Sequence, residues 1–247
     1  MRIEPLLEAE DVQMFLGEGA ACVHALKGVS LSVAPGQLTL LMGPSGSGKS
    51  TLLSILGCIL KQSKGTVRVA GAPTTNMTTE QLAALRRDHI GFVFQSYNLF
   101  PGLTALENVK TGLAIRRRTG QNTVEAAQRA LEAVGLGHRM RSRPGQLSGG
   151  EQQRVAMARA IVANPGIVLA DEPTAALDSE AGRNVMQQLQ RLARHQNCAV
   201  LVVSHDNRVL AFADRVVGMQ DGQILSDKLG AQGVRSPDGP MEADIHD

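Results

Sequence analysis

Short apolar runs alternate with helix-like segments along most of this 247-residue chain. Three runs are almost wholly apolar and end in glycine or polar residues, at Gln37–Met42, Ile167–Ala170 and Ala199–Val203. We expect each run to form a buried strand, because apolar runs of this length without alternation are typical of parallel strands that are covered on both faces. A helix is expected from Lys49 to Leu60, directly after the first of these strands. This order of elements predicts an α/β fold.

The region from Thr104 to Ala163 has a different pattern. Its apolar residues recur mostly at helical spacing, and it contains no strong strand candidate. We interpret it as a helical subdomain, about residues 96–163, inserted in the α/β core. From residue 229 to 247 the chain is rich in Gly, Pro, Asp and Ser, which predicts a flexible tail. The sequence therefore predicts one domain over residues 1–228, followed by that tail.

Composition narrows the classes of function. The chain is 43% hydrophobic with a net charge of +2, which argues against intrinsic disorder and for a buried core. Its three cysteines lack the spacing of a zinc site or a disulfide framework. Aromatic residues make up only 2% of the chain, so we expect no nucleic-acid partner. The basic run at 116–118 fits a solvated helix end better than a nucleic-acid patch. No run approaches the roughly 20 apolar residues of a membrane-spanning helix.

A glycine-rich loop follows the first predicted strand and opens the predicted helix. Its sequence, GPSGSGKST, matches the pattern G-x-x-x-x-G-K-[ST] of phosphate-binding loops. Glycines let the backbone wrap around phosphates, and the N–H groups at the helix start attract the anion. Lys49 is expected to reach the β and γ phosphates, and the Ser50 hydroxyl to hold Mg²⁺. The expected nucleotide-binding residues here are Gly43, Pro44, Ser45, Gly46, Ser47, Gly48, Lys49, Ser50 and Thr51.

The loop alone indicates only a nucleoside triphosphate, and a small kinase stays open as an alternative. A second element, IVLADEPT, delivers Asp171 and Glu172 at the end of the second predicted strand. Ligands of open α/β sheets bind at such carboxyl ends. Asp171 fits the role of orienting Mg²⁺, and Glu172 fits a general base that polarises the attacking water. Alternatively, the Asp-Glu-Pro sequence only closes the strand.

The segment LSGGEQQR, Leu147–Arg154, lies between these two elements and resembles the signature motif of ATP-binding cassette (ABC) proteins. The resemblance covers roughly residues 5–228. It implies a RecA-like phosphate-loop core with an antiparallel β edge and an inserted helical subdomain. It also implies ATP hydrolysis with Mg²⁺. Ser148 and Glu151 form a capping-box pattern, so the helix from Gly149 to about Val162 would point its N-terminus at an anion.

Other residues take roles from the same resemblance. Gln95 resembles the Q-loop glutamine, a Mg²⁺ or water contact and a hinge. Asp178 in AALD resembles the D-loop aspartate, and His205 in LVVSHD resembles the switch histidine that contacts the γ-phosphate. Phe15 stands where the family places an aromatic residue under adenine. Without the resemblance, Gln95 and His205 would be polar residues at strand ends, and Phe15 a core or surface residue.

The family assembles as a head-to-tail dimer that sandwiches two ATP molecules. Since this chain carries one set of motifs, the resemblance implies a second copy of the chain as a partner. The signature residues of one copy would then complete the phosphate-loop site of the other. Those expected to contact ATP in this way are Ser148, Gly149, Gly150 and Gln152.

Three further segments resemble the exporter-like group of lipoprotein-releasing, macrolide-exporter and FtsE-type ATPases. They are ENV at Glu107–Val109, FVFQ with NLFP, and EQQRVAMARA. The stretch from His205 to Ile224 resembles DevA-type ATPases. This implies the ATPase subunit of an exporter for a lipid, lipoprotein or drug-like substrate, held peripherally at the cytoplasmic face of the inner membrane. A non-transport ABC ATPase, in iron–sulfur assembly or an FtsE-like role, and a solute-importer ATPase are the alternatives.

The partners implied are a separate membrane permease and a membrane-fusion protein. The apolar segment Tyr97–Leu103 follows Gln95. It would either receive the permease or pack inside the helical subdomain.

Overall fold

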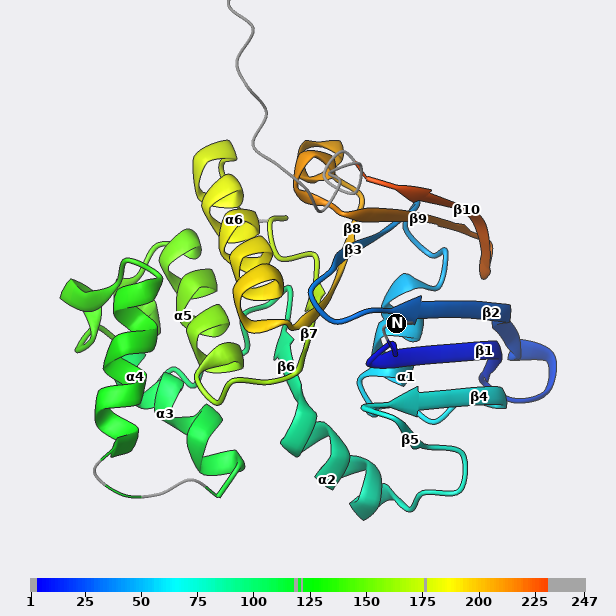
Figure 1. Cartoon of the computed structure of the whole chain (residues 1–247), viewed down its shortest axis with the longest axis horizontal. Coiled ribbons are helices and arrows are strands. Elements are labelled where there is room, and N and C mark those ends of the chain that lie inside the picture. The colour runs from blue at the N-terminus through cyan, green and yellow to red at the C-terminus, as the bar shows by residue number, and fades with distance from the viewer. Residues whose placement is uncertain (1–3, 118–119, 121, 176, 231–247) are drawn as a thin grey trace, which may run out of the picture.

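The computed structural model describes residues 4–117, 120, 122–175 and 177–230, so the region 231–247 of the predicted tail lies outside it. A six-stranded sheet forms its centre, in the order β10-β9-β3-β8-β7-β6 (Figure 1). β10 is antiparallel to β9, and the other neighbours are parallel. Its strands are β3 (Leu38–Met42), β6 (Ile90–Val93), β7 (Ile167–Asp171), β8 (Ala199–Ser204), β9 (Arg215–Gln220) and β10 (Gln223–Leu229). The three strands predicted from apolar runs are confirmed, each within one residue at its ends.

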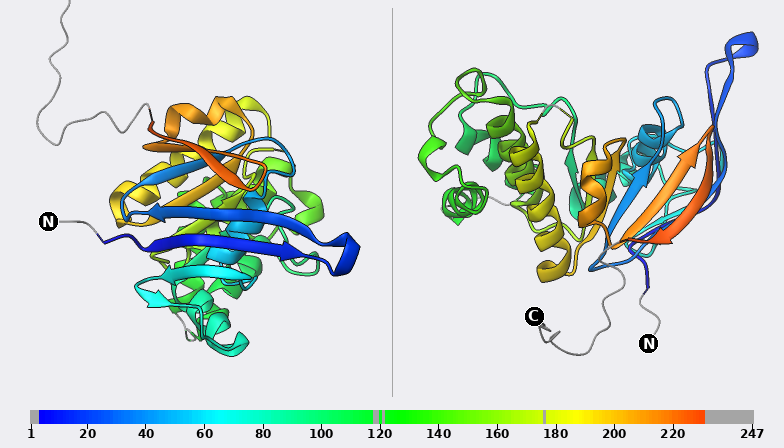
Figure 2. Two further views of the ribbon diagram at one scale, coloured as in Figure 1. Left: turned by 90° about the vertical axis from the view of Figure 1, so that its right-hand side faces the viewer. Right: turned by 90° about the horizontal axis from the view of Figure 1, so that it is seen from above.

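A four-stranded antiparallel sheet lies beside the first, in the order β2-β1-β4-β5. Its strands are β1 (Leu7–Leu16), β2 (Val23–Val33), β4 (Lys64–Val69) and β5 (Ala72–Pro73). The short η1 turn (Gly19–Ala21) closes the β1–β2 hairpin, whose tip projects beyond the rest of the molecule (Figure 2). The sequence resemblance predicted this antiparallel β edge.

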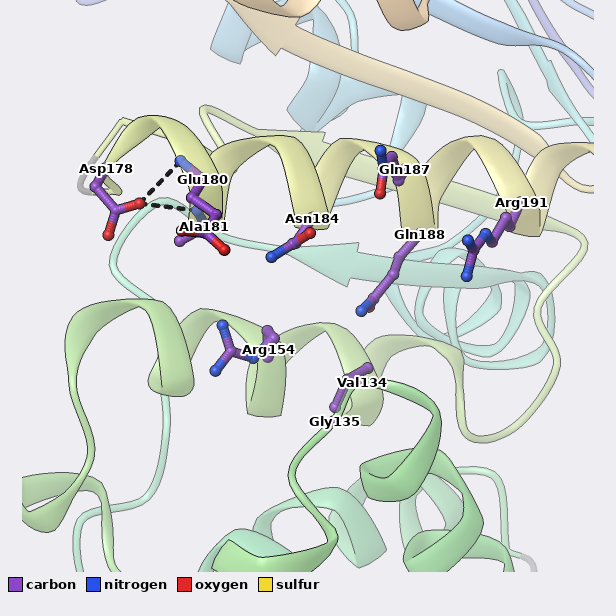
Figure 3. A pocket seen from close by; sticks show the side chains of 10 residues that line it. All are labelled: Val134, Gly135, Arg154, Asp178, Glu180, Ala181, Asn184, Gln187, Gln188 and Arg191. Atoms are coloured by element: carbon purple, nitrogen blue, oxygen red, sulfur yellow. Dashed lines mark hydrogen bonds between the residues drawn. The ribbon is translucent and has the colours of Figure 1, made fainter.

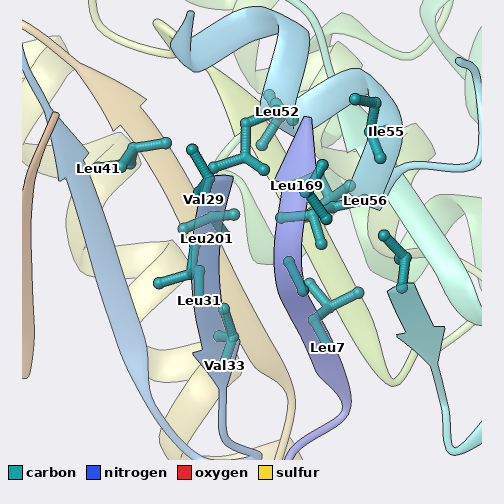
Figure 4. Packing of buried hydrophobic residues seen from close by; sticks show 14 of the residues in the cluster. Leu7, Val29, Leu31, Val33, Leu41, Leu52, Ile55, Leu56, Leu169 and Leu201 are labelled. Atoms are coloured by element: carbon teal, nitrogen blue, oxygen red, sulfur yellow. The ribbon is translucent and has the colours of Figure 1, made fainter. Parts of the chain in front are cut away.

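Helix α1 (Lys49–Leu56) fills the space between the two sheets. Leu52 and Leu56 are fully buried there, between side chains of both sheets such as Leu7 and Leu169 (Figure 4). Burying a leucine contributes about 1.5–3 kcal/mol, so this cluster holds α1 in its place between the two sheets. The predicted extension of this helix to Leu60 is wrong. The helix ends at Leu56 with Gly57 as its C-cap, and Cys58 follows with a left-handed φ of 55°.

The other face of the large sheet is covered by α6 (Ser179–Gln196) and η4 (Asn207–Phe212). Leu40, Val168 and Val200 are fully buried on this side, whereas Leu41, Leu169 and Leu201 are buried on the α1 side. Both faces of the strands are therefore covered, which explains why their sequences show no alternation.

A helical lobe lies at one end of the sheet, formed by α3 (Ala105–Ile115), α4 (Asn122–Ala133) and α5 (Gly149–Ile161) (Figure 1). It has its own apolar core, and the turns η2 (Gly137–Arg139) and η3 (Pro144–Gln146) connect α4 to α5. Helix α2 (Thr79–His89), which contacts β6, was not predicted. Capping boxes start α2, α3 and α5. The helical character predicted for Thr104–Ala163 is confirmed.

Candidate functional site

The pairing of the parallel strands brings the predicted motifs to one edge of the sheet. Val93 of β6 is level with Ala170 of β7, Asp171 with Val203 of β8, and Ser204 with Met42 of β3. The residues that follow these strands include Gln95, Glu172, His205 and the glycine-rich loop. The sequence alone could not predict which residues of neighbouring strands pair. The rule that ligands bind at the carboxyl ends of parallel strands did predict the edge of the sheet at which the site lies.

The glycine-rich loop passes close to two neighbouring segments. A Cβ at Gly43 would stand 2.0 Å from the Met219 carbonyl oxygen, and one at Gly48 would stand 2.8 Å from that of Ala25. Gly48 also has a left-handed φ of 97° and directly precedes α1. Only glycine meets both demands. The loop therefore aims the N-terminus of α1, with its partial positive charge, at the edge of the sheet.

Lys49 lies almost fully buried inside this loop. Its Nζ donates hydrogen bonds to the carbonyl oxygens of Gly43 (2.8 Å) and Pro44 (2.7 Å), and more weakly to Ser47 Oγ (3.4 Å). Burial lowers the pKa of Lys49, and the negative charges of Glu172 and Asp171 oppose that shift. The loop thus holds an ammonium group where it can attract an anion.

Ser50 and Asp171 meet across the same edge, with Ser50 Oγ donating to Asp171 Oδ1 at 3.2 Å. Burial raises the pKa of Asp171, and the charge of Glu172 adds to the rise. The hydrogen bond from Ser50 and the charge of Lys49 oppose it. A partly buried carboxylate beside a hydroxyl is the hard oxygen donor set that Mg²⁺ prefers. A divalent cation would also offset the cost of keeping Asp171 ionised, so these two residues fit the predicted magnesium site.

Glu172 and His205 form a close pair. His205 Nδ1 lies 2.7 Å from Glu172 Oε1, and the Glu172 side chain is 12% exposed whereas that of His205 is 62% exposed. The other carboxylate oxygen, Oε2, is buried and has no hydrogen-bond partner among the described residues. Glu172 takes a left-handed φ of 47°, and its N–H donates to the Val203 carbonyl at 2.9 Å. One oxygen is therefore held in place, while the other keeps its capacity to accept a proton.

These groups line one pocket of about 580 Å³. Nine predicted residues contribute to its wall, and Asp171 adjoins it through Ser50. No sequence motif predicted the remaining wall, which comes from the β1–β2 hairpin and the β9–β10 turn. The nine are Ser45, Gly46, Gly48, Lys49, Ser50, Thr51, Gln95, Glu172 and His205, and the wall residues without a motif are Leu16, Val23, His24, Ala25, Lys27, Asp221 and Gly222.

Phe15 does not line this pocket, although its neighbours Leu16 and His24 do. The Phe15 ring stacks on the imidazole of His24, with ring centroids 4.2 Å apart and planes inclined by 14°. The structure thus brings Phe15 to the edge of the pocket through His24, and its contact with a base stays a prediction.

The signature residues lie away from the phosphate loop of their own chain. Ser148 caps α5, since its Oγ accepts a hydrogen bond from the Glu151 N–H (3.2 Å) and Glu151 Oε2 accepts one from the Ser148 N–H (2.8 Å). The predicted N-cap is therefore present. Neither Ser148, Gly149, Gly150 nor Gln152 contributes to the pocket around Lys49.

Asp178 caps α6, accepting hydrogen bonds from the N–H groups of Glu180 (2.9 Å) and Ala181 (2.8 Å). It lines a second, polar pocket of about 580 Å³ between α5 and α6, opposite Arg154 (Figure 3). The signature helix and the D-loop aspartate are thus neighbours, and both lie outside the phosphate-loop pocket.

Comparison with known proteins identifies the family of this chain. Residues 26–175 match the family model described as ABC transporter. The chain is 44% identical over 227 residues to the macrolide export ATP-binding/permease protein MacB of Marinobacter nauticus. The aligned residues make up 92% of this chain and 35% of that protein. For MacB 1 of Aeromonas hydrophila the identity is 43% over 240 residues, covering 97% of this chain and 36% of that protein. The chain spans about a third of the length of these relatives.

A relative of similar length is the uncharacterized ABC transporter ATP-binding protein MJ0796 of Methanocaldococcus jannaschii, with 43% identity over 89% of this chain and 95% of that protein. A solved dimeric structure of the cassette MJ0796, in a post-hydrolysis state with ADP and Pi, matches with a TM-score of 0.85 and 41% identity over 90% of this chain and 98% of that one. These matches agree with the signature LSGGEQQR and with the fold. The chain belongs to the ABC transporter family and has the ATP-binding cassette fold.

Proposed function

We propose that this chain binds ATP with Mg²⁺ and hydrolyses it as the motor of an ABC exporter. The observation that carries the proposal is the pocket that combines Lys49, Glu172 and His205 at the carboxyl edge of the parallel sheet. It joins a buried cation for the phosphates to a carboxylate with one oxygen that accepts no hydrogen bond from the described residues. Family membership supports ATP as the nucleotide.

In this proposal Lys49 and the N–H groups at the start of α1 bind the β and γ phosphates. Glu172 Oε2 accepts a proton from the attacking water, because within the described part of the chain this carboxylate oxygen has no competing hydrogen-bond partner. His205 holds Oε1 and orients that carboxylate. Gln95, in the same pocket wall, contacts the water or the metal.

Ser50 and Asp171 would hold Mg²⁺, with Gln95 as the third residue proposed around it. The ion would neutralise charge on the phosphates that Lys49 alone leaves uncompensated. The fit rests on the 3.2 Å contact between Ser50 and Asp171 and on the burial that raises the pKa of Asp171.

The active form in this proposal is a dimer of two copies. The two helix starts of one chain, at Lys49 and at Gly149, lie in different places. A head-to-tail arrangement would let Ser148, Gly149, Gly150 and Gln152 of one copy face the phosphate loop of the other. The solved structure of the cassette MJ0796 with ADP and Pi is dimeric, which supports a dimer as the active form.

The permease partner is proposed to dock in a groove of about 1,210 Å³ between the helical lobe and the sheet core. Its wall is largely apolar, and Phe100, Ile115 and Ile59 are between 46% and 60% exposed. Phe100 belongs to the predicted docking segment Tyr97–Leu103. The MacB relatives are named ATP-binding/permease proteins, which supports a membrane partner for this chain. No helix in the described ranges (4–117, 122–175 and 177–230) is long and apolar enough to cross a bilayer.

We infer an exporter of a lipid, lipoprotein or drug-like substrate, acting at the cytoplasmic face of the membrane, with a membrane-fusion protein in the same assembly. The test is to purify the chain from native membranes in a single detergent, to assay the product for ATPase activity, and to identify the proteins bound to it. A permease and Mg²⁺-dependent ATPase activity are expected. Recovery with soluble partners only would overturn the exporter assignment, and an absence of ATP hydrolysis would overturn the motor.

A further inference from the structure

The chain makes an unusual turn directly after Gln95. Tyr97 and Asn98 both have left-handed backbone conformations, with φ values of 59° and 47°. L-residues with a Cβ avoid this region, and asparagine tolerates it better than tyrosine does. Two consecutive residues in this region need support from their surroundings.

That support comes from Arg159 of the signature helix α5. Its Nη2 donates to the Tyr97 carbonyl at 2.7 Å, and its Nη1 donates to the Asn98 carbonyl at 2.5 Å. Burial lowers the pKa of Arg159, and no carboxylate forms an ion pair with it in the described ranges. A partly buried guanidinium therefore directs its hydrogen bonds at the two strained residues.

Both sides of this contact are themselves held firmly. On the helix side, a Cβ at Gly112 would stand 2.3 Å from the Arg159 carbonyl oxygen, so α3 and α5 touch at this residue. On the loop side, the fully buried Asn108 accepts a hydrogen bond from the Phe100 N–H (2.8 Å) and donates to the carbonyls of Phe100 and Leu103. The turn thus has little freedom to move unless α5 moves with it.

Arg159 also stands where three functional regions meet. It lines the large apolar groove together with Asn98 and Phe100. The turn that it holds lies two residues beyond Gln95, which lines the nucleotide pocket. The helix that carries it begins at Gly149, in the signature.

We propose that Arg159 is a positioning residue that links the groove, the Gln95 turn and the signature helix, so that movement of any one of them is passed to the other two. This inference rests on the proposed function, because it assigns the linkage to the ATPase cycle. Arg159 touches neither nucleotide nor metal in this proposal. Its effect is exerted through the backbone carbonyls of Tyr97 and Asn98.

Arg86 offers a matched control in the same groove. It lies on α2, and its Nη1 donates to the Cys58 carbonyl at 2.5 Å. It thus shares with Arg159 the residue type, the groove and a backbone-carbonyl partner, but it is not attached to the Gln95 turn. A purely structural role for Arg159 predicts that Arg86→Gln and Arg159→Gln have similar effects.

The test compares Arg159→Gln, Arg159→Lys and Arg86→Gln in the full chain, below the thermal midpoint of every variant. Amide hydrogen exchange without nucleotide should be faster over residues 95–99 in Arg159→Gln and unchanged there in Arg86→Gln. Turnover of Arg159→Gln should fall about tenfold or more with little change in KM, since a displaced group near the reacting centre lowers kcat. Arg159→Lys should restore part of the turnover.

Equal exchange over residues 95–99 in Arg159→Gln and the wild type would overturn the linkage. An equal loss of turnover in Arg86→Gln would overturn it as well. A wild-type chain without ATPase activity would instead refute the proposed function, and the exchange comparison would then still decide whether Arg159 holds the turn.

Discussion

Glu172→Gln tests the proposed chemistry most directly. It replaces one carboxylate oxygen with an NH₂ group and leaves the volume of the side chain almost unchanged. In the structure Oε1 is held 2.7 Å from His205 Nδ1, whereas Oε2 has no partner among the described residues. A glutamine can keep the contact with His205 through either amide atom. The variant therefore loses the proton acceptor while the pocket keeps its shape.

The magnitude follows from what remains. Lys49 and Ser50 are untouched, so phosphate binding and metal binding should persist. A positioned general base contributes about 10²–10⁴ in rate, which corresponds to about 3–5 kcal/mol of transition-state stabilisation. We expect turnover at saturating Mg-ATP to fall by at least about 100-fold, with the affinity for ATP within about threefold of the wild type.

Phosphate release measures turnover, and size-exclusion chromatography with Mg-ATP should detect a trapped dimer of Glu172→Gln. Glu125→Gln is the control, since Glu125 is an exposed residue of α4 that pairs only weakly with Arg129 at 3.6 Å. Turnover of Glu172→Gln within tenfold of the wild type would refute the assignment of Glu172 as the base.

Three further predictions concern binding and stability. Lys49→Ala removes an ammonium group that the loop holds with hydrogen bonds of 2.7 and 2.8 Å; ATP affinity in calorimetry should fall about tenfold or more, and unchanged affinity would contradict the phosphate-loop role. Gly91→Ala places a Cβ 2.4 Å from the Ala160 carbonyl oxygen, whereas Gly102 has open space; urea unfolding should show a loss of about 1–3 kcal/mol for Gly91→Ala and almost none for Gly102→Ala. Burial raises the pKa of Asp171 in the folded chain above its ordinary value of 3.8. At pH values above the raised pKa, the ionised carboxylate therefore lowers the free energy of unfolding. Asp171→Asn should therefore raise the thermal midpoint at pH 7, lose this gain as the pH falls toward 3.8, and abolish Mg²⁺-dependent hydrolysis. A constant gain at all pH values would contradict this cause.

The sequence predicted the parts of the fold whose burial is simplest. β3, β7 and β8 are covered on both faces, so their apolar runs stood out. Helix α2 was missed because none of its residues is fully buried, and only Leu82 and Leu85 pack against the core, which leaves a weak apolar pattern in its sequence. The predicted end of α1 at Leu60 was wrong because apolar residues continue past Gly57, where tertiary packing turns the chain. A Cβ at Gly57 would stand 2.9 Å from the Phe92 ring.

The site was predictable where a motif concentrates the chemistry in adjacent residues. The glycine-rich loop and Asp171–Glu172 are such segments, and the structure brings both to one edge. The wall formed by Leu16, His24 and Lys27 was not predictable, since it depends on how the antiparallel sheet lies against the large one. The same dependence explains why Phe15 contacts His24 and does not itself line the pocket.

Two residues that follow strands of the large sheet have strained backbone conformations, and their support shows on which elements the site depends. Glu172 and Tyr97 both have left-handed conformations, and each follows a strand of the same parallel sheet. Each such residue costs about 1–3 kcal/mol. At Glu172 the strained residue itself belongs to the pocket wall, which it shares with Lys49 and His205. The hydrogen bonds from Glu172 to the Val203 carbonyl and from Arg159 to the Tyr97 carbonyl offset this cost. The two strained positions are thus held by groups from β8 and α5, so the geometry of the nucleotide pocket depends on where these two elements lie.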